Sequence, residues 1–335
     1  MTAAPAAAPA PPPARRPRKQ PRAAARPPAA GVRLKPAPVT LAADATLDDA
    51  MAAIFAAARE HWLVNTPAAL AGEDIEGVHQ VRVGLRRFRS ALSLFKRYLP
   101  AAQREWLKGE ARWLLSELGP VRDLDVFAVE LLPPVAIRRQ MRTVRTLSDA
   151  VRPARALAHG KAAAALDSAR ARRFLSRLEV WLAGRGWRSA GEAKDPRTAT
   201  AQSFALRALN KRLVKILARG KRIDHLPVPE LHQLRIAVKK VRYGIEFFHD
   251  VLPKRRAARL AETLKNLQDS LGRLNDLDVA REIAAQLTAA ADNAKAAADI
   301  AAGGSLVVDH HRKLADDAVH GIAPRWRAVR KCGLL

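Results

Sequence analysis

An internal duplication constrains the fold of this 335-residue chain more than any other feature of its sequence. Residues 79–95 are HQVRVGLRRFRSALSLF, and residues 232–248, which lie 153 positions later, are HQLRIAVKKVRYGIEFF. The same spacing places LGPVRDLDV at 118–126 on LGRLNDLDV at 271–279. Solenoid units repeat every 20–50 residues or so, and this repeat is much longer. The sequence therefore predicts two copies of one folded unit.

The hydrophobic pattern indicates that both copies are helical. From Leu47 onward, apolar residues recur at three- and four-residue spacing, and alternating strand patterns are missing. We predict an all-α fold of two pseudo-symmetric helical bundles, each a four-helix unit whose short connections make neighbouring helices antiparallel. Breaks are expected at Pro67, Gly72, Gly272 and Gly303-Gly304, among others. The predicted helices are 47–65, 74–98, 101–118 and 121–147 in the first half, and 199–219, 229–250, 254–271 and 274–301 in the second.

The duplicated helix carries a row of cations on the side opposite its predicted core face. In the first copy the row spans about 80° of the helix and is roughly 15 Å long. Its members are His79, Arg82, Arg86 and Arg89, and the core face is Val81, Leu85, Phe88, Leu92 and Phe95. The second copy repeats the row as His232, Arg235, Lys239 and Arg242, and the core face as Leu234, Val238, Val241, Ile245 and Phe248.

Such a row is typical of a surface that binds a linear anion. No acidic residue lies between Glu76 and Glu105, or between Glu230 and Glu246, although like charges at these spacings destabilise a helix. The arginine fork matches phosphate oxygens, and lysine adds a point charge. A histidine beside an anion favours its protonated form, so we expect it to add charge at mildly acidic pH. An ordinary solvated basic face is the competing interpretation.

Further cations either extend this surface or are ordinary surface charge. Arg112 and Lys265 match each other in the repeat, and one face of the predicted helix 199–219 carries Arg207, Lys211 and Lys215.

Composition widens the range of candidate ligands. The chain has 59 Lys and Arg against 32 Asp and Glu, a net charge of +27, which attracts nucleic acid, anionic membrane surfaces and phosphate polymers alike. Aromatic residues are only 5% of the chain, which disfavours stacking on single-stranded nucleic acid. The sequence contains no run of about 18 uncharged apolar residues, so we expect no membrane span. The single cysteine, Cys332, predicts no disulfide and favours the cytoplasm.

The domain organisation follows from composition and from the repeat. Residues 1–42 are rich in Ala, Pro and Arg, and the first acidic residue is Asp44. We predict a disordered basic arm there, which serves either as a solubilising tail or as an accessory anion-binding tether. The rest, 43–335, is predicted to be one domain with halves at about 43–195 and 196–335.

The two Asp-Leu-Asp segments admit two interpretations. Asp123 and Asp125, and Asp276 and Asp278, would serve as metal ligands or as a general acid and base in a phosphohydrolase. We favour a structural role, in which one Asp caps a helix after the Gly break and the other pairs with an Arg of the basic helix. We likewise interpret His310-His311 as a surface pair, and we predict no metal, cofactor or catalytic residue.

These segments together resemble the CHAD family, the conserved histidine α-helical domain, over about residues 45–330. The resemblance implies a duplicated helical bundle with a basic central groove, and binding of inorganic polyphosphate at polyphosphate granules. The family's histidines correspond to His79 and His232. Its basic positions correspond to Arg82, Arg86, Arg87 and Arg89, and to Arg235, Lys239, Lys240 and Arg242.

We therefore predict non-enzymatic polyphosphate binding in the cytoplasm, at those granules. Nucleic-acid binding or tethering through the N-terminal arm and metal-dependent phosphohydrolysis are the alternatives.

Overall fold

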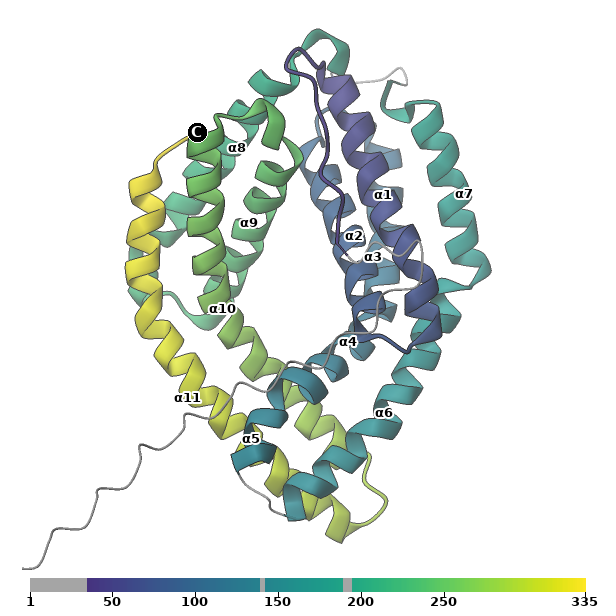
Figure 1. The fold of residues 1–335 in the computed structure, drawn as a ribbon, viewed down its shortest axis with the longest axis vertical. Coiled ribbons are helices and arrows are strands. Elements are labelled where there is room, and N and C mark those ends of the chain that lie inside the picture. Colours follow the sequence, from purple (N-terminus) through teal and green to yellow (C-terminus); the bar gives the residue numbers. More distant parts are fainter. Residues whose placement is uncertain (1–34, 139–141, 189–194) are drawn as a thin grey trace, which may run out of the picture. The chain divides into compact units, whose positions relative to one another are not determined.

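Helices make up nearly all of the residues that the computed structural model describes, which are 35–138, 142–188 and 195–335 (Figure 1). No strand forms within these ranges, where a single β-bridge joins Thr46 to Thr200. The predicted all-α fold is confirmed. The predicted arm falls mostly on residues 1–34, which lie outside the described residues. Its predicted end at residue 42 is wrong, because Val39 and Leu41 are buried and the amide of Leu41 donates to Asp250 Oδ2 at 3.0 Å.

The first half contains more elements than its sequence predicts. They are α1 (Leu47–Ala71), α2 (Ile75–Leu94), α3 (Ala101–Glu117), α4 (Gly119–Val126), the π-helix η1 (Phe127–Leu131), α5 (Pro133–Arg138), α6 (Arg142–Leu166), α7 (Ala169–Ala183) and the short 3₁₀ helices η2 (Gly186–Arg188) and η3 (Pro196–Thr198). The second half contains α8 (Ala201–Arg219), η4 (Gly220–His225), α9 (Val228–Phe247), η5 (His249–Val251), α10 (Lys254–Ala289) and α11 (Ala294–Cys332).

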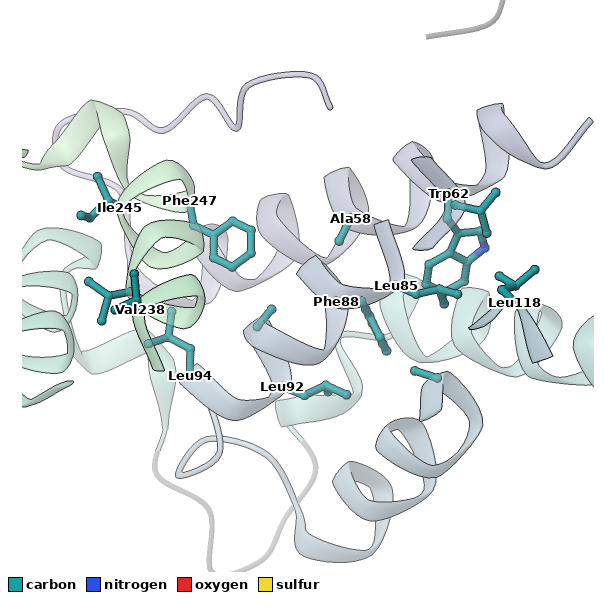
Figure 2. Packing of buried hydrophobic residues seen from close by; sticks show 14 of the residues in the cluster. Ala58, Trp62, Leu85, Phe88, Leu92, Leu94, Leu118, Val238, Ile245 and Phe247 are labelled. Carbon is teal, nitrogen blue, oxygen red and sulfur yellow. The ribbon is translucent and has the colours of Figure 1, made fainter. Parts of the chain in front are cut away.

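Helices α1 and α2 pack unusually closely. Gly84 of α2 lies against α1, such that an added Cβ would sit 2.8 Å from the backbone nitrogen of Trp62. The rings of Trp62 and Phe88 meet edge to face, 5.6 Å between centroids (Figure 2). All ten residues of the two predicted core faces are buried, which confirms the predicted orientation of α2 and α9.

Three predicted helix breaks are wrong because packing overrides local preference. Helix α1 continues through Pro67 and ends at Gly72, whose φ of 69° is left-handed. Helix α10 runs through Gly272 because buried residues such as Leu277 and Ile283 extend its packed face. Gly303 and Gly304 lie inside α11, where an added Cβ would approach Thr143 O of α6 to 2.5 Å and Ala284 of α10 to 2.7 Å. A glycine cost of about 1 kcal/mol in a helix is outweighed by such close approach.

The predicted helix 121–147 is also wrong. The chain instead forms α4, η1 and α5 before α6 begins at Arg142. One consequence is that LGPVRDLDV covers the short helix α4, whereas its counterpart LGRLNDLDV lies inside the long helix α10. The two halves therefore share the pair of helices before this segment but differ after it.

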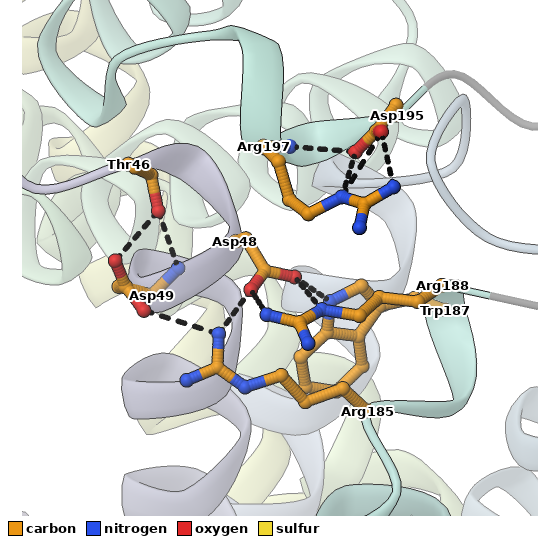
Figure 3. A network of polar contacts seen from close by, with 8 residues as sticks. All are labelled: Thr46, Asp48, Asp49, Arg185, Trp187, Arg188, Asp195 and Arg197. Carbon is orange, nitrogen blue, oxygen red and sulfur yellow. Dashed lines mark hydrogen bonds and ion pairs between the residues drawn. The ribbon is translucent and has the colours of Figure 1, made fainter.

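A buried carboxylate anchors the end of the first half to its beginning (Figure 3). Asp48 of α1 is 1% exposed and accepts from Trp187 Nε1 at 2.7 Å and from Arg188 Nε at 3.1 Å, and it also pairs with Arg185. Burial alone would raise the pKa of Asp48, but hydrogen bonds from Arg188, Trp187 and Arg185 outweigh it and lower the pKa. Two arginines are thereby neutralised by the protein itself.

We expect Gly84→Ala to destabilise the protein by about 1–3 kcal/mol, because its Cβ would collide with the α1 backbone. Gly272→Ala is the matched control, since an added Cβ would meet nothing within 4 Å and should stabilise by about 0.5–1 kcal/mol. Urea unfolding followed by circular dichroism gives both values. Equal stabilities of the two variants would contradict the close packing of α1 on α2.

Candidate anion-binding site

Helix α2 carries the first cation row and is capped at its N-terminus. The side chain of Asp74 accepts from Glu76 N at 2.8 Å at its N-terminus. Beyond this cap, His79, Arg86 and Arg89 are half-buried, whereas Arg82 is only 9% exposed. The row therefore lies along a partly enclosed surface.

Arg82 is held by neutral and anionic neighbours. Its Nη1 donates to the carbonyl of Leu115 at 2.8 Å, and Asp123 of α4 interacts with it electrostatically. Burial and the neighbouring Arg86 and Arg122 lower its pKa to about 10, an effect that Asp123 opposes. Positive charge is thus crowded here even though one carboxylate lies nearby.

The second row on α9 has corresponding supports from α10. Arg235 Nη1 donates to Asn275 Oδ1 at 3.1 Å, and Arg242 Nη1 donates to Gln268 Oε1 at 3.2 Å. Burial lowers the pKa of Lys239 to about 7, and Arg235, Arg86 and Arg242 add to the effect. Lys239 consequently loses a large part of its charge near neutral pH in the free protein.

Arg86 brings the two rows together. It interacts electrostatically with Arg82 and Arg89 of its own helix, and with Arg235 and Lys239 of α9. Each of these four side chains has its pKa lowered, with burial as the largest cause and Arg86 among the others. Cations from both halves of the chain therefore share one region around Arg86.

Arg87 is predicted from the sequence to bind the ligand, but the structure buries it in an ion pair. Its side chain is only 4% exposed, and Nη1 pairs with Glu246 Oε2 of α9 at 2.5 Å. Its guanidinium also lies over the ring of Phe247, 5.0 Å from the centroid. Arg87 is enclosed between α2 and α9, so we correct its assignment from ligand binding to joining the two helices.

The two histidines differ in their surroundings. Burial lowers the pKa of His79 to about 4, and Arg122, Arg86 and Arg82 strengthen the shift against Glu76. His79 is therefore neutral at mildly acidic pH in the free protein, and its gain of charge beside a bound anion stays a prediction. His232 is exposed at the start of α9.

The Asp-Leu-Asp segments do not cap helices, which corrects that prediction. Helix α4 has no side-chain cap, and Asp276 and Asp278 lie inside α10. Asp123 and Asp276 instead interact electrostatically with Arg82 and Arg235, the corresponding arginines of the two rows. Burial is the largest cause of the raised pKa of both carboxyl groups.

The remaining two carboxylates of these segments lie in unlike places. Asp125 is 3% exposed and accepts from Arg155 Nη2 of α6 at 2.6 Å. Asp278 is exposed and lies 3.6 Å from Arg281 of its own helix. The prediction for His310-His311 is wrong for His311, which is 2% exposed with Nε2 2.9 Å from Leu131 O.

The two matched cations outside the rows, Arg112 and Lys265, have different surroundings. Arg112 of α3 is exposed and interacts electrostatically with Arg89, so it adjoins the first row. Lys265 of α10 is exposed and lies 4.0 Å from Glu262. Arg122 interacts with His79 and Arg82, and the sequence comparison missed it because the second copy has Asn275 in its place.

The described residues include no group of three or more His, Cys, Asp or Glu that would hold a metal ion. Of the helices in the described ranges, none is long and apolar enough to span a lipid bilayer.

Comparison with known proteins places this arrangement in a family. The model of the CHAD domain matches residues 53–285. Two uncharacterized proteins of Mycobacterium tuberculosis, MT2285 of strain CDC 1551 / Oshkosh and Rv2226 of strain ATCC 25618 / H37Rv, are each 28% identical over 233 residues. The match covers 68% of this chain but 43% of each relative, so the chain spans less than half the length of these curated relatives.

Solved structures agree on the fold. The crystal structure of the CHAD domain from the plant Ricinus communis has a TM-score of 0.75 and 30% sequence identity, and the match covers 88% of this chain and 96% of that one. PptA from Streptomyces chartreusis has a TM-score of 0.60 at 19% identity, over 84% of this chain and 100% of that one, which shows similarity of fold alone.

The lowered pKa of Lys239 predicts that polyanion binding weakens as the pH rises above 7. A bound anion favours the protonated amine and raises its pKa, so binding takes up a proton between about pH 7 and the higher, bound-state value. The dissociation constant should rise by up to about tenfold per pH unit in this window. Lys239→Arg stays charged and should flatten the dependence. Titrations with polyanion across this pH range measure the dissociation constants of both proteins. Equal slopes of the dissociation constant against pH would contradict the prediction.

We expect Arg87→Met to cost roughly 1–3 kcal/mol of folding stability, because Glu246 loses its partner at 2.5 Å and keeps only Arg242, which lies 3.9 Å away. The double variant Arg87→Met, Glu246→Gln should recover part of this loss. Denaturant unfolding of both proteins measures the coupling. A single variant as stable as the wild type would mean that the pair does not hold α2 to α9.

Proposed function

This chain belongs to the CHAD domain family, and we propose that it binds inorganic polyphosphate through the two cation rows, without catalysing a reaction on it. The observation that carries the proposal is the position of Arg86, which interacts with cations of both rows. A linear polyanion lying over Arg86 would meet the α2 row on one side and the α9 row on the other.

The electrostatics of the free protein favour such a ligand. Partly buried cations that repel one another destabilise the unliganded state. The lowered pKa values of Arg82 and Lys239 show that the charged form of each side chain is disfavoured there. Closely spaced phosphates would neutralise several cations at once. Arginine forks would bind phosphate oxygens in pairs, and Lys239 would regain its proton.

The carboxylates support a binding role over a hydrolytic one. Asp123 and Asp276 lie beside Arg82 and Arg235, so each carboxylate acts on a guanidinium of the rows. Asp125 is occupied by Arg155. Holding arginines in place fits a surface that binds and releases its ligand. We further propose that this binding associates the protein with polyphosphate granules, as the family resemblance implies.

The proposal predicts that Arg86→Gln with Lys239→Gln weakens binding of long-chain polyphosphate at least tenfold. This variant removes one half-buried cation from each row. It should also reduce the slope of log affinity against log salt by roughly 1.4, at about 0.7 per phosphate contact, by analogy with single-stranded nucleic acid. Fluorescence titration at several salt concentrations measures both quantities.

The matched control is Arg255→Gln with Arg256→Gln, which removes two exposed charges from α10 outside the rows. It should change affinity by less than about twofold, because exposed distant charges are screened. If both variants bind equally well, the rows are not the site. If DNA at equal phosphate concentration displaces polyphosphate from the wild type, the nucleic-acid alternative replaces the proposal.

A further inference from the structure

A cavity of about 910 Å³ opens between α8, α9 and the C-terminal end of α2, away from the supports of the two rows. Its charged lining residues are Lys96, Arg97, Arg207, Lys211, Arg212, Lys215, Arg219 and Lys240. No carboxylate occurs among the described residues that line it. Four of the cations, Arg207, Lys211, Lys215 and Arg219, follow one another at four-residue intervals and form one wall along α8.

Arg212 shows that this charge is not balanced from within. Burial lowers its pKa to about 10. Its guanidinium hydrogen bonds go to neutral groups, from Nη1 to the carbonyl of Lys240 and from Nη2 to Ser93 Oγ, each at 3.4 Å. Both bonds are long for a charged donor. A half-buried guanidinium held this weakly leaves donor capacity for an anion.

Lys240 connects the cavity to the first row. Burial lowers its pKa, and Arg212, Arg89 and Lys108 add to the effect. Arg89 belongs to the α2 row, so the positive field continues from the row into the cavity. The cavity is nevertheless built mainly by α8, which contributes no residue to either row.

Comparison of the two halves accounts for the positive charge of the cavity. In the repeat, Arg87 corresponds to Lys240, and Glu246 corresponds to Ser93. Arg87 is neutralised by Glu246, whereas Lys240 and Ser93 both line the cavity. The same interface between α2 and α9 is therefore closed by an ion pair at one position and left cationic at the corresponding one.

The glycines of the two repeated helices also differ. Gly84, which lets α2 lie against α1, corresponds to Ala237, a residue of α9 that lines the cavity. Gly77, which packs on the backbone of Ala68, corresponds to Glu230. At these positions α9 carries side chains where α2 has none, and one of them, Ala237, lines the cavity. The close approach of α9 to α8 occurs instead at Gly244, against the side chain of Leu209.

We propose that this cavity is a second anion site that binds a compact oligophosphate group. Cations reach it from α8, from α9 and from the segment that follows α2, so they surround a short, highly charged ligand more completely than a single row does. The arginines supply forks for phosphate oxygens, and an oligophosphate supplies the charge that the protein lacks here. The ligand is either a free small molecule or the end of a polyphosphate chain that leaves the first row at Arg89.

Tripolyphosphate is the probe that tests the cavity, by isothermal titration of the full chain. Arg207→Gln, Lys211→Gln, Lys215→Gln removes three exposed cavity cations and should weaken binding at least tenfold. Arg255→Gln, Arg256→Gln, Arg259→Gln removes equal charge from the exposed face of α10 and should change it less than about twofold. Equal affinities of the two triple variants, or no binding by the wild type, would overturn the proposal.

A single exposed position gives a sharper test that leaves the cations in place. Ser93→Glu supplies the carboxylate that the corresponding position of the second half has, and should weaken tripolyphosphate binding at least fivefold. Ser93→Gln has the same shape without the charge and should bind like the wild type. If the two variants bind equally, charge in the cavity does not govern binding.

Two further experiments distinguish binding in the cavity from binding at the rows. Arg86→Gln with Lys239→Gln should lose affinity for long-chain polyphosphate yet keep tripolyphosphate binding in the cavity, so either site can fail without the other. Preloading the wild type with long-chain polyphosphate identifies the source of the ligand. Loss of tripolyphosphate binding means that a chain end occupies the cavity, and retention means that a separate molecule does.

Discussion

The ion pair between Arg87 and Glu246 is the interaction on which the candidate site depends. It joins α2 to α9, and thus the two copies of the repeat, at a distance of 2.5 Å, with Arg87 almost fully buried and Glu246 partly exposed. The cation rows lie on these same two helices and repel each other around Arg86. An attractive contact is needed to hold the rows together without a ligand, and the contact of Arg87 with Phe247 strengthens it.

Charge is distributed unevenly along the molecule, and the unevenness supports the two proposed anion sites. Around Asp48, arginines are neutralised by a buried carboxylate (Figure 3). Along the rows, Asp123 and Asp276 offset only part of the positive charge. In the cavity beside α8, the described lining residues include no carboxylate at all. The first arrangement has a structural role, whereas the other two leave positive charge unbalanced, which is the basis on which we propose them as anion sites.

Helical periodicity predicted the parts of the fold that depend on local pattern. Both core faces are buried as expected, because apolar residues at this spacing share one side of a helix. Helix breaks predicted at glycines are where local preference and packing disagree. Gly303 and Gly304 suggest a break by local preference, yet they let α11 approach its neighbours closely, and the packing gained keeps the helix intact. A single sequence does not distinguish these two uses of glycine.

The sequence by itself determined the family, the helical class and the two cation rows, because a repeat in one register and a helical period are properties of residue order alone. Only the tertiary structure decided which cations are free to bind. Arg87 lies beside the row in sequence but is buried against Glu246, and Lys240, its counterpart, faces an open cavity. Both outcomes depend on residues about 150 positions away, whose approach is set by packing between helices and not by the helix that carries the charge.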